Sequence, residues 1–181
     1  RAPDLFLDRA IKFGKFPLHR ITNTHELKSI CRGMAMFKKI LYPTDFSDVA
    51  QEAIKYIDQL RDGARQWVFI LHAIDSRVLD LLIYNPIISM EIEKNLREDA
   101  QSSMDSLRVH FEETGFEVET SIEVGIPASV ILRTEEAEDV SIIAMGSHGK
   151  SNVREMILGS VSEEVIHSSR KPVLIVKRPS R

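Results

Sequence analysis

Apolar residues in this chain form short runs separated by longer amphipathic segments. Four runs are mainly apolar, as is typical of strands in a parallel sheet covered on both faces: residues 37–43, 67–73, 142–145 and 172–177. A fifth run, 116–124, alternates apolar and polar side chains, which predicts a half-exposed strand at an edge of the sheet.

The segments between the runs have the spacing of amphipathic helices. One helix is predicted at 49–60, after a cap at Ser47 or Asp48, and a long one from about Glu91 to Glu113, preceded by an irregular segment at 75–90. Another opens at Pro127, because proline suits the first turn of a helix. Strands that alternate with helices predict an α/β fold: a Rossmann-like, open, parallel five-stranded sheet with helices on both faces.

The length of 181 residues, with 43% hydrophobic content, suits one well-buried domain and a short extension. We expect the domain to span residues 36–181. The single cysteine, Cys31, excludes a disulfide within the chain, and no apolar run reaches the length of a membrane span. These features predict a soluble, cytoplasmic protein without membrane contact.

Residues 1–35 differ from the rest of the chain in pattern and in charge. They lack sustained apolar spacing, so no element is predicted there, and Met34 or Met36 looks like an initiator. Residues 1–33 hold seven Lys or Arg and three Asp or Glu, whereas the remainder holds 17 and 24. We therefore expect 1–35 to be a surface extension outside the core, and the acidic domain disfavours nucleic acid as a partner.

Residues 140–162 combine an apolar strand, a glycine loop and the start of a helix. Gly146 and Gly149 follow the strand and are expected to let the backbone turn sharply and approach a ligand. Gly159 precedes the next helix, where Ser160 and Glu163 have the spacing of a capping box. Two glycine turns beside the N–H groups of a helix N-terminus form a cradle suited to phosphates.

The spacing of this stretch, Gly-x2-Gly-x9-Gly-Ser, resembles the motif of the universal stress protein family, in its ATP-binding branch. The resemblance runs from Met36 to Lys177 and includes the segments 43–47 (Pro-Thr-Asp-Phe-Ser), 71–73 (Leu-His-Ala) and 125–127 (Gly-Ile-Pro). It implies the strand order 3-2-1-4-5, which places the alternating strand at one edge and a ligand crevice between strands one and four.

The resemblance also implies a site for ATP, with Mg²⁺ or Mn²⁺ bound through the phosphates and no metal ligand from the protein. Asp45 is expected to contact adenine or ribose beside the backbone of Ala73, although residues of this type also serve as turn formers. Lys150 and Arg154 either shield phosphate charge or are exposed loop cations. The expected site residues are Pro43, Thr44, Asp45, Ala73, Met145, Gly146, Ser147, His148, Gly149, Gly159, Ser160 and Val161.

The function implied by the resemblance is that of an ATP-binding stress-response regulatory module. Nucleotide occupancy would order the loop at 147–158 and change association with a partner. The rival is an enzyme, a slow ATPase or a nucleotidyl transferase, but no residue that would orient His148 as a base is evident from the sequence. In a further alternative, the glycines serve only tight turns and a helix start. In another, the domain belongs to the family but has lost nucleotide binding, and the intact glycines disfavour this interpretation.

The last run, 172–177, is apolar on both faces, and the implied order leaves it at a sheet edge with unpaired backbone groups. The resemblance implies that this strand pairs with its counterpart across the two-fold axis of a homodimer. The alternative is that residues 1–33 fold over this edge and keep the chain monomeric.

Overall fold

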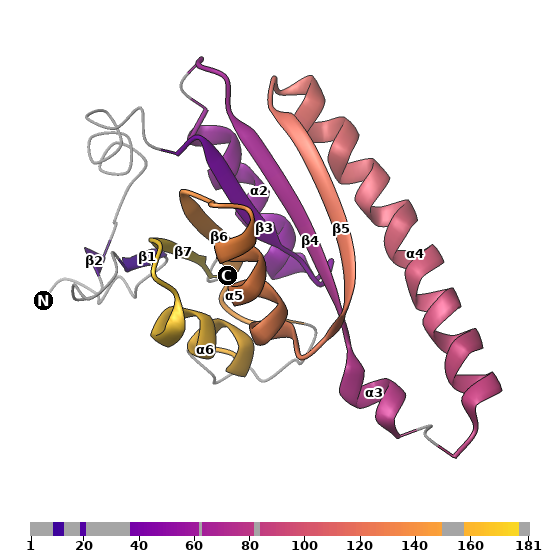
Figure 1. The fold of residues 1–181 in the computed structure, drawn as a ribbon. Helices are drawn as coiled ribbons and strands as arrows, with labels where there is room; N and C mark the ends of the chain where they lie inside the picture. The colour runs from indigo at the N-terminus through magenta and orange to yellow at the C-terminus, as the bar shows by residue number, and fades with distance from the viewer. Residues whose placement is uncertain are drawn as a thin grey trace, which may run out of the picture.

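The computed structural model of this chain describes residues 9–12, 19–20, 37–61, 63–81, 84–149 and 158–177. These residues form one sheet with helices on both of its faces (Figure 1). Lys150 and Arg154, the two expected loop cations, lie outside the described residues.

Five parallel strands form the body of the sheet. Their spatial order is β5-β4-β3-β6-β7, which is the predicted order 3-2-1-4-5 when the strands are numbered along the domain. Every residue of β5 is half-buried whereas every residue of β6 and β7 is buried, so the edge strand predicted from alternation is confirmed. The strands are β3 (Lys39–Pro43), β4 (Trp67–Asp75), β5 (Glu117–Gly125), β6 (Ile142–Gly146) and β7 (Val173–Val176).

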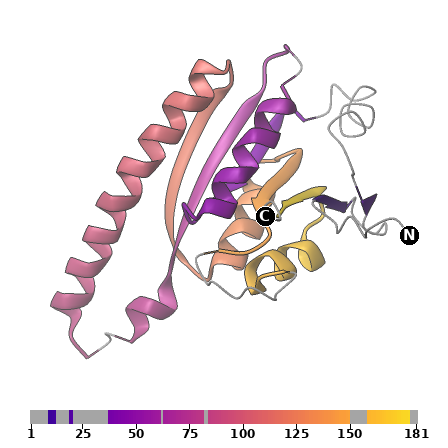
Figure 2. The same cartoon turned by 180° about the vertical axis from the view of Figure 1, so that it is seen from behind.

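Helices cover both faces of these five strands, as predicted. On one face lie α2 (Asp48–Gln59) and α4 (Pro86–Glu113), and on the other α5 (Pro127–Ala137) and α6 (Ser160–Ser168) (Figures 1 and 2). Because successive residues of a strand point to opposite faces, Ile40 and Tyr42 of β3 join the core beneath α2 and α4, whereas Leu41 joins the other core. All three side chains are fully buried, so β3 is the centre of the domain.

The long helix α4 starts earlier than the sequence pattern indicated. It begins at Pro86 rather than near Glu91, because Asn85 caps it by accepting a hydrogen bond from the Ile88 amide at 3.3 Å. Apolar side chains of its first turns are exposed, so they do not belong to the buried apolar face from which the helix was predicted. A short helix, α3 (Ser76–Asp80), also forms in the segment predicted to be irregular, and it extends past the end of the sheet (Figure 1).

The prediction of a capping box at α6 is wrong. The N-cap of this helix is Gly159, which makes no side-chain cap bond, and Ser160 is the first helical residue. Gly159 donates its amide to the Ser147 carbonyl at 2.7 Å, and its own carbonyl accepts the Glu163 amide at 2.9 Å. The backbone bond to Ser147 therefore fixes where the helix starts, one residue before the serine of the predicted box.

Two strands that the sequence did not predict extend the sheet beyond β7. β1 (Arg9–Lys12) pairs with β7 antiparallel, with Arg9 opposite Val176 and Lys12 opposite Val173, and β2 (His19–Arg20) pairs with β1. The expectation that the last strand lies at an open edge is therefore wrong for this chain, and the alternative that residues from 1–33 cover this edge is confirmed. The physical reason is that the outer side of β7 carries backbone N–H and C=O groups that need partners, and β1 supplies them.

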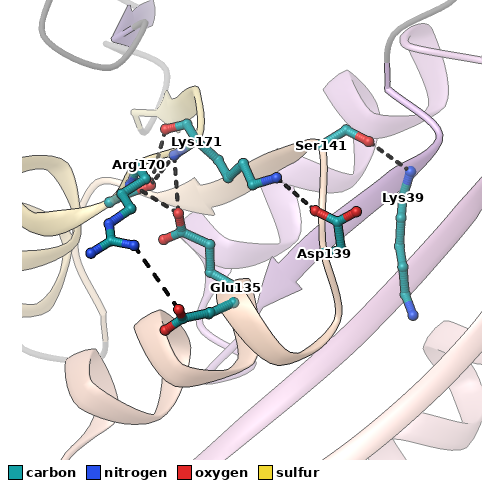
Figure 3. Close-up of polar contacts among 8 residues, drawn as sticks. Lys39, Glu135, Asp139, Ser141, Arg170 and Lys171 are labelled. Carbon is teal, nitrogen blue, oxygen red and sulfur yellow. Dashed lines mark hydrogen bonds and ion pairs between the residues drawn. The ribbon is translucent and has the colours of Figure 1, made fainter.

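A buried carboxylate holds the turn that leads into β7 (Figure 3). Glu135 of α5 accepts hydrogen bonds from the backbone amides of Arg170 and Lys171, at 2.9 and 3.0 Å. Nearby, the Lys39 amide donates to the Ser141 hydroxyl at 3.2 Å. These contacts fix the amino ends of the strands, and the functional site forms at the opposite ends.

Candidate functional site

A cavity of about 300 Å³ opens at the carboxyl ends of β3 and β6. In an open parallel sheet, neighbouring connections diverge at such a point and leave a crevice in which ligands bind. Of the twelve residues predicted from the sequence, all but Ser147 line this cavity: Pro43, Thr44, Asp45, Ala73, Met145, Gly146, His148, Gly149, Gly159, Ser160 and Val161.

The loop after β3 holds the carboxylate of Asp45 at the cavity. Thr44 donates its amide to the Leu71 carbonyl of β4 at 2.9 Å. Asp45 Oδ1 accepts a hydrogen bond from the Ser47 amide at 3.1 Å, and the Ser47 hydroxyl caps α2 by accepting from the Ala50 amide at 3.3 Å. Asp45 thus forms the turn before α2 and also lines the cavity, so its two expected roles do not exclude each other.

Phe46, the next residue of this loop, has a φ of 61°, in the left-handed region that bulky residues rarely adopt. Its ring stacks on His72, with ring centroids 4.7 Å apart and an interplanar angle of 28°. His72 Nδ1 lies 2.8 Å from the Thr44 carbonyl oxygen. The His72 side chain therefore packs the loop against β4, through the backbone of Thr44 before Asp45 and the ring of Phe46 after it.

Gly146 and Gly149 permit close approach between two loops. Neither has a positive φ, so conformational freedom is not what requires glycine at these positions. A Cβ on Gly146 would lie 3.1 Å from backbone atoms of Val49 at the start of α2, and a Cβ on Gly149 would overlap the Asp45 carboxylate. The glycine loop therefore lies directly against the loop after β3, and the two loops form adjacent walls of the cavity.

The two ends of the glycine loop meet at Ser147, which is fully buried. The Ser147 carbonyl accepts the Gly159 amide at 2.7 Å and the Ser162 hydroxyl at 2.6 Å, and its amide donates to the Val176 carbonyl of β7 at 2.7 Å. This junction brings the N-terminus of α6 to the same cavity as Gly149. Backbone N–H groups and the helix dipole favour an anion there.

Six cavity residues were not indicated by the sequence: Ala50, Leu71, Asp75, Pro127, Ile131 and Ser162. Leu71, Ala73 and Asp75 alternate along β4, so they point to the same side of the strand. Asp75 accepts a hydrogen bond from Arg77 Nε at 2.9 Å, and this guanidinium lowers the pKa of the Asp75 carboxyl. Asp75 is therefore ionised at neutral pH, and its charge is balanced by the Arg77 guanidinium.

The described residues contain no group of three or more His, Cys, Asp or Glu side chains arranged to bind a metal ion. In the part of the chain that the structure describes, no helix is long and apolar enough to span a membrane.

Comparison with known proteins decides the family. The model of the universal stress protein family matches residues 36–177. The chain belongs to the universal stress protein family. A relative in this family, universal stress protein MJ0577 of Methanocaldococcus jannaschii, is 42% identical over 156 residues, which cover 79% of this chain and 96% of that protein.

Solved structures of universal stress proteins share this fold. The structure of MJ0577 has a TM-score of 0.76 at 43% identity and covers 81% of this chain and 100% of its own. A universal stress protein from Arabidopsis thaliana, solved with AMP bound, has a TM-score of 0.57 at 16% identity and covers 79% and 93%. The family match begins at residue 36, so β1 and β2 lie outside it.

Proposed function

We propose that this universal stress protein is an ATP-binding regulatory module of the stress response. The observation that carries the proposal is the convergence of three distant segments on one cavity: the loop after β3, the glycine loop after β6 and the N-terminus of α6. The first segment offers a carboxylate, and the other two offer backbone N–H groups and room for close approach. A ligand with hydroxyl groups at one end and several negative charges at the other fits this arrangement.

The nucleoside would bind along β4 and α5. The carboxylate of Asp45 is an acceptor for ribose hydroxyls, and the backbone of Ala73 can bond the edge of adenine. Pro127 and Ile131 of α5 add apolar walls against which a base can pack. The Arabidopsis protein of the same fold, solved with AMP bound, supports a nucleotide as the class of ligand.

The phosphates would bind between the glycine loop and α6. Gly149, Gly159 and Ser160 border this part of the cavity, with His148 beside them and Met145, Gly146 and Val161 around the ribose. The carboxylate of Asp45 also lines the cavity, so the negative charges of a triphosphate would lie close to a carboxylate. Mg²⁺ or Mn²⁺ bridging the phosphates would reduce this repulsion without a ligand from the protein.

Regulation follows if nucleotide occupancy orders the loop at 147–158 and changes the association with a partner. Trypsin tests the first step, because Lys150 and Arg154 are potential cleavage sites inside the spacer. We expect saturating ATP with Mg²⁺ to slow cleavage after both residues, while cleavage after the exposed Arg65 stays unchanged as an internal control. Equal rates with and without ATP would contradict the ordering step.

Homodimerisation through β7 is the form of association that we propose. The inner edge of β7 pairs with β6, so a second copy can add only at the outer edge, where β1 is paired. A dimer therefore requires β1 to leave, and the two arrangements compete for the same backbone groups.

A slow ATPase is the second candidate function. The observation in its favour is that the Ser147 hydroxyl lies 2.8 Å from His148 Nδ1, so the imidazole at the cavity has a partner that fixes its orientation and could stabilise charge on a phosphate during its transfer. Phosphate release over many turnovers under saturating ATP separates the two candidates. Release of less than one phosphate per chain supports a binding module, and sustained release supports an enzyme. Mass spectrometry of the small molecule that co-purifies with the protein identifies the ligand in either case.

A further inference from the structure

We propose that Ser147 is a positioning residue that sets the tautomer of His148, so that the imidazole offers an N–H donor to the phosphates. The inference rests on the proposed nucleotide site and assigns a role to the one predicted residue that does not line the cavity. It concerns the side chain of Ser147, whose backbone already joins the two ends of the glycine loop.

The Ser147 side chain is fully buried, and its Oγ lies 2.8 Å from His148 Nδ1. Among the described residues, this ring nitrogen is the partner that the structure gives to the hydroxyl. The bonds to Gly159, Ser162 and Val176 are made by the Ser147 backbone. None of them uses the Ser147 hydroxyl, so they do not determine where its proton points.

The direction of the hydrogen bond follows from this burial. If Nδ1 carried the proton, the hydroxyl would accept it, and the buried O–H of Ser147 would have no acceptor among the described residues. Proteins avoid this arrangement because a buried donor without a partner loses its bond to water and gains none. The Ser147 hydroxyl therefore donates to Nδ1, and the proton of the neutral imidazole lies on Nε2.

An Nε2–H is a hydrogen-bond donor, and the oxygen atoms of a phosphate are acceptors. The opposite tautomer would present a nitrogen lone pair to a phosphate oxygen, which is repulsive. His148 lines the cavity together with Gly149 and Ser160. Ser147 therefore contributes to phosphate binding through His148, without contact to the ligand.

A double-mutant cycle tests this role on the full chain. We expect Ser147→Ala to weaken ATP binding about tenfold, the effect of one lost charge-assisted hydrogen bond, and to leave adenosine binding unchanged. In a His148→Ala background, the same substitution should have no further effect on ATP affinity. Equal losses in both backgrounds, or an equal loss for adenosine, would show that Ser147 only supports the packing of the junction.

Thr134→Val is the matched control, because Thr134 is also buried and its hydroxyl bonds the Val130 carbonyl within α5 at 2.9 Å. This variant should keep the ATP affinity of the parent. NMR of ¹⁵N-labelled histidine in the ligand-free protein tests the tautomer without any nucleotide. We expect His148 to be entirely in the Nε2–H form, and to become a mixture of tautomers in Ser147→Ala. An Nδ1–H form in the parent protein, or no change in the variant, would overturn the proposal even if ATP binding itself were absent.

Discussion

Gly149 lies so close to Asp45 that the smallest side chain at position 149 would overlap the aspartate carboxylate. Asp45 Oδ1 accepts the Ser47 amide at 3.1 Å, so the carboxylate cannot move aside without loosening the turn that starts α2. The glycine loop, which we propose binds the phosphates, and the loop after β3, which we propose binds the nucleoside, are thus in direct contact. A change at Gly149 therefore acts on both ends of the proposed nucleotide site.

The first prediction is that Gly149→Ala weakens ATP binding without unfolding the domain. The added methyl group displaces Asp45 and reduces the room beside the phosphates, so we expect affinity to fall by at least about tenfold. Titration calorimetry measures the affinity, and thermal melting shows whether the domain remains folded. A lower melting temperature with unchanged affinity would assign Gly149 a purely structural role.

Gly63→Ala is the matched control for this substitution. Gly63 has a φ of 86°, and a Cβ there would meet nothing within 4 Å. Alanine at this position is strained by its backbone conformation alone, which costs about 1 kcal/mol. We expect Gly63→Ala to lower the melting temperature and to leave ATP affinity unchanged, whereas Gly149→Ala lowers ATP affinity.

The second prediction separates Gly146 from Gly149. A Cβ on Gly146 would lie 3.1 Å from backbone atoms of Val49 and Ala50, which cannot rotate away as the end of a side chain can. Gly146→Ala should therefore push β6 and α2 apart and destabilise the domain by about 1–3 kcal/mol. Urea unfolding measures this loss. Unchanged stability in Gly146→Ala would show that the contact with α2 relaxes at no cost.

The third prediction concerns Tyr42, whose buried hydroxyl donates to the Ala50 carbonyl at 2.7 Å. Burial raises the pKa of this phenol above its ordinary value near 10, because the charged form loses its hydration. A raised folded-state pKa gives stability that is present below the ordinary pKa and is lost as pH rises toward the folded-state value. At neutral pH, Tyr42→Phe should lower the free energy of unfolding by about 1 kcal/mol. Above pH about 10, the variant should lose less stability than the parent protein as the pH rises.

Urea unfolding of the parent protein and Tyr42→Phe at a series of pH values measures both effects. The two stability curves should converge in the alkaline range. Curves that stay parallel from neutral to alkaline pH would contradict the assignment of the alkaline loss to Tyr42.

The sheet was predictable from the sequence because its signals are local. The apolar runs of β3, β4, β6 and β7 and the alternation of β5 each indicate a strand without reference to any other part of the chain. The strand order came from the family resemblance. The covering of β7 by residues from 1–33 was one of the two alternatives left open, but the strand β1 and its register could not be predicted, because Arg9–Lys12 is short and its partner is more than a hundred residues away.

The site was predictable where one motif spans it and not where distant segments meet. The glycine motif located Gly149, Gly159 and Ser160 at the cavity, whereas Pro127 and Ile131 reach it only because α5 packs beside β4. The contact of Ser147 with His148 was not predictable, because the sequence does not indicate that the small polar side chain of Ser147 is fully buried.

The fourth prediction is that a chain starting at Met36 forms a dimer, whereas the full chain is monomeric. Removing residues 1–35 removes β1 and β2 and leaves the outer edge of β7 unpaired. Light scattering on both chains at equal concentrations measures the mass. A monomer in both cases would defeat the proposed dimer, and a dimer in both would show that β1 does not control it.

ATP binding itself is tested most directly by titration calorimetry of the nucleotide-free full chain with ATP and Mg²⁺. The cavity formed by Asp45, the glycine loop and the N-terminus of α6 predicts saturable binding of one ATP per chain. Adenosine should bind more weakly, because it makes no contact with Gly149, Gly159 and Ser160. Absence of saturable ATP binding by the pure, folded protein would contradict the account.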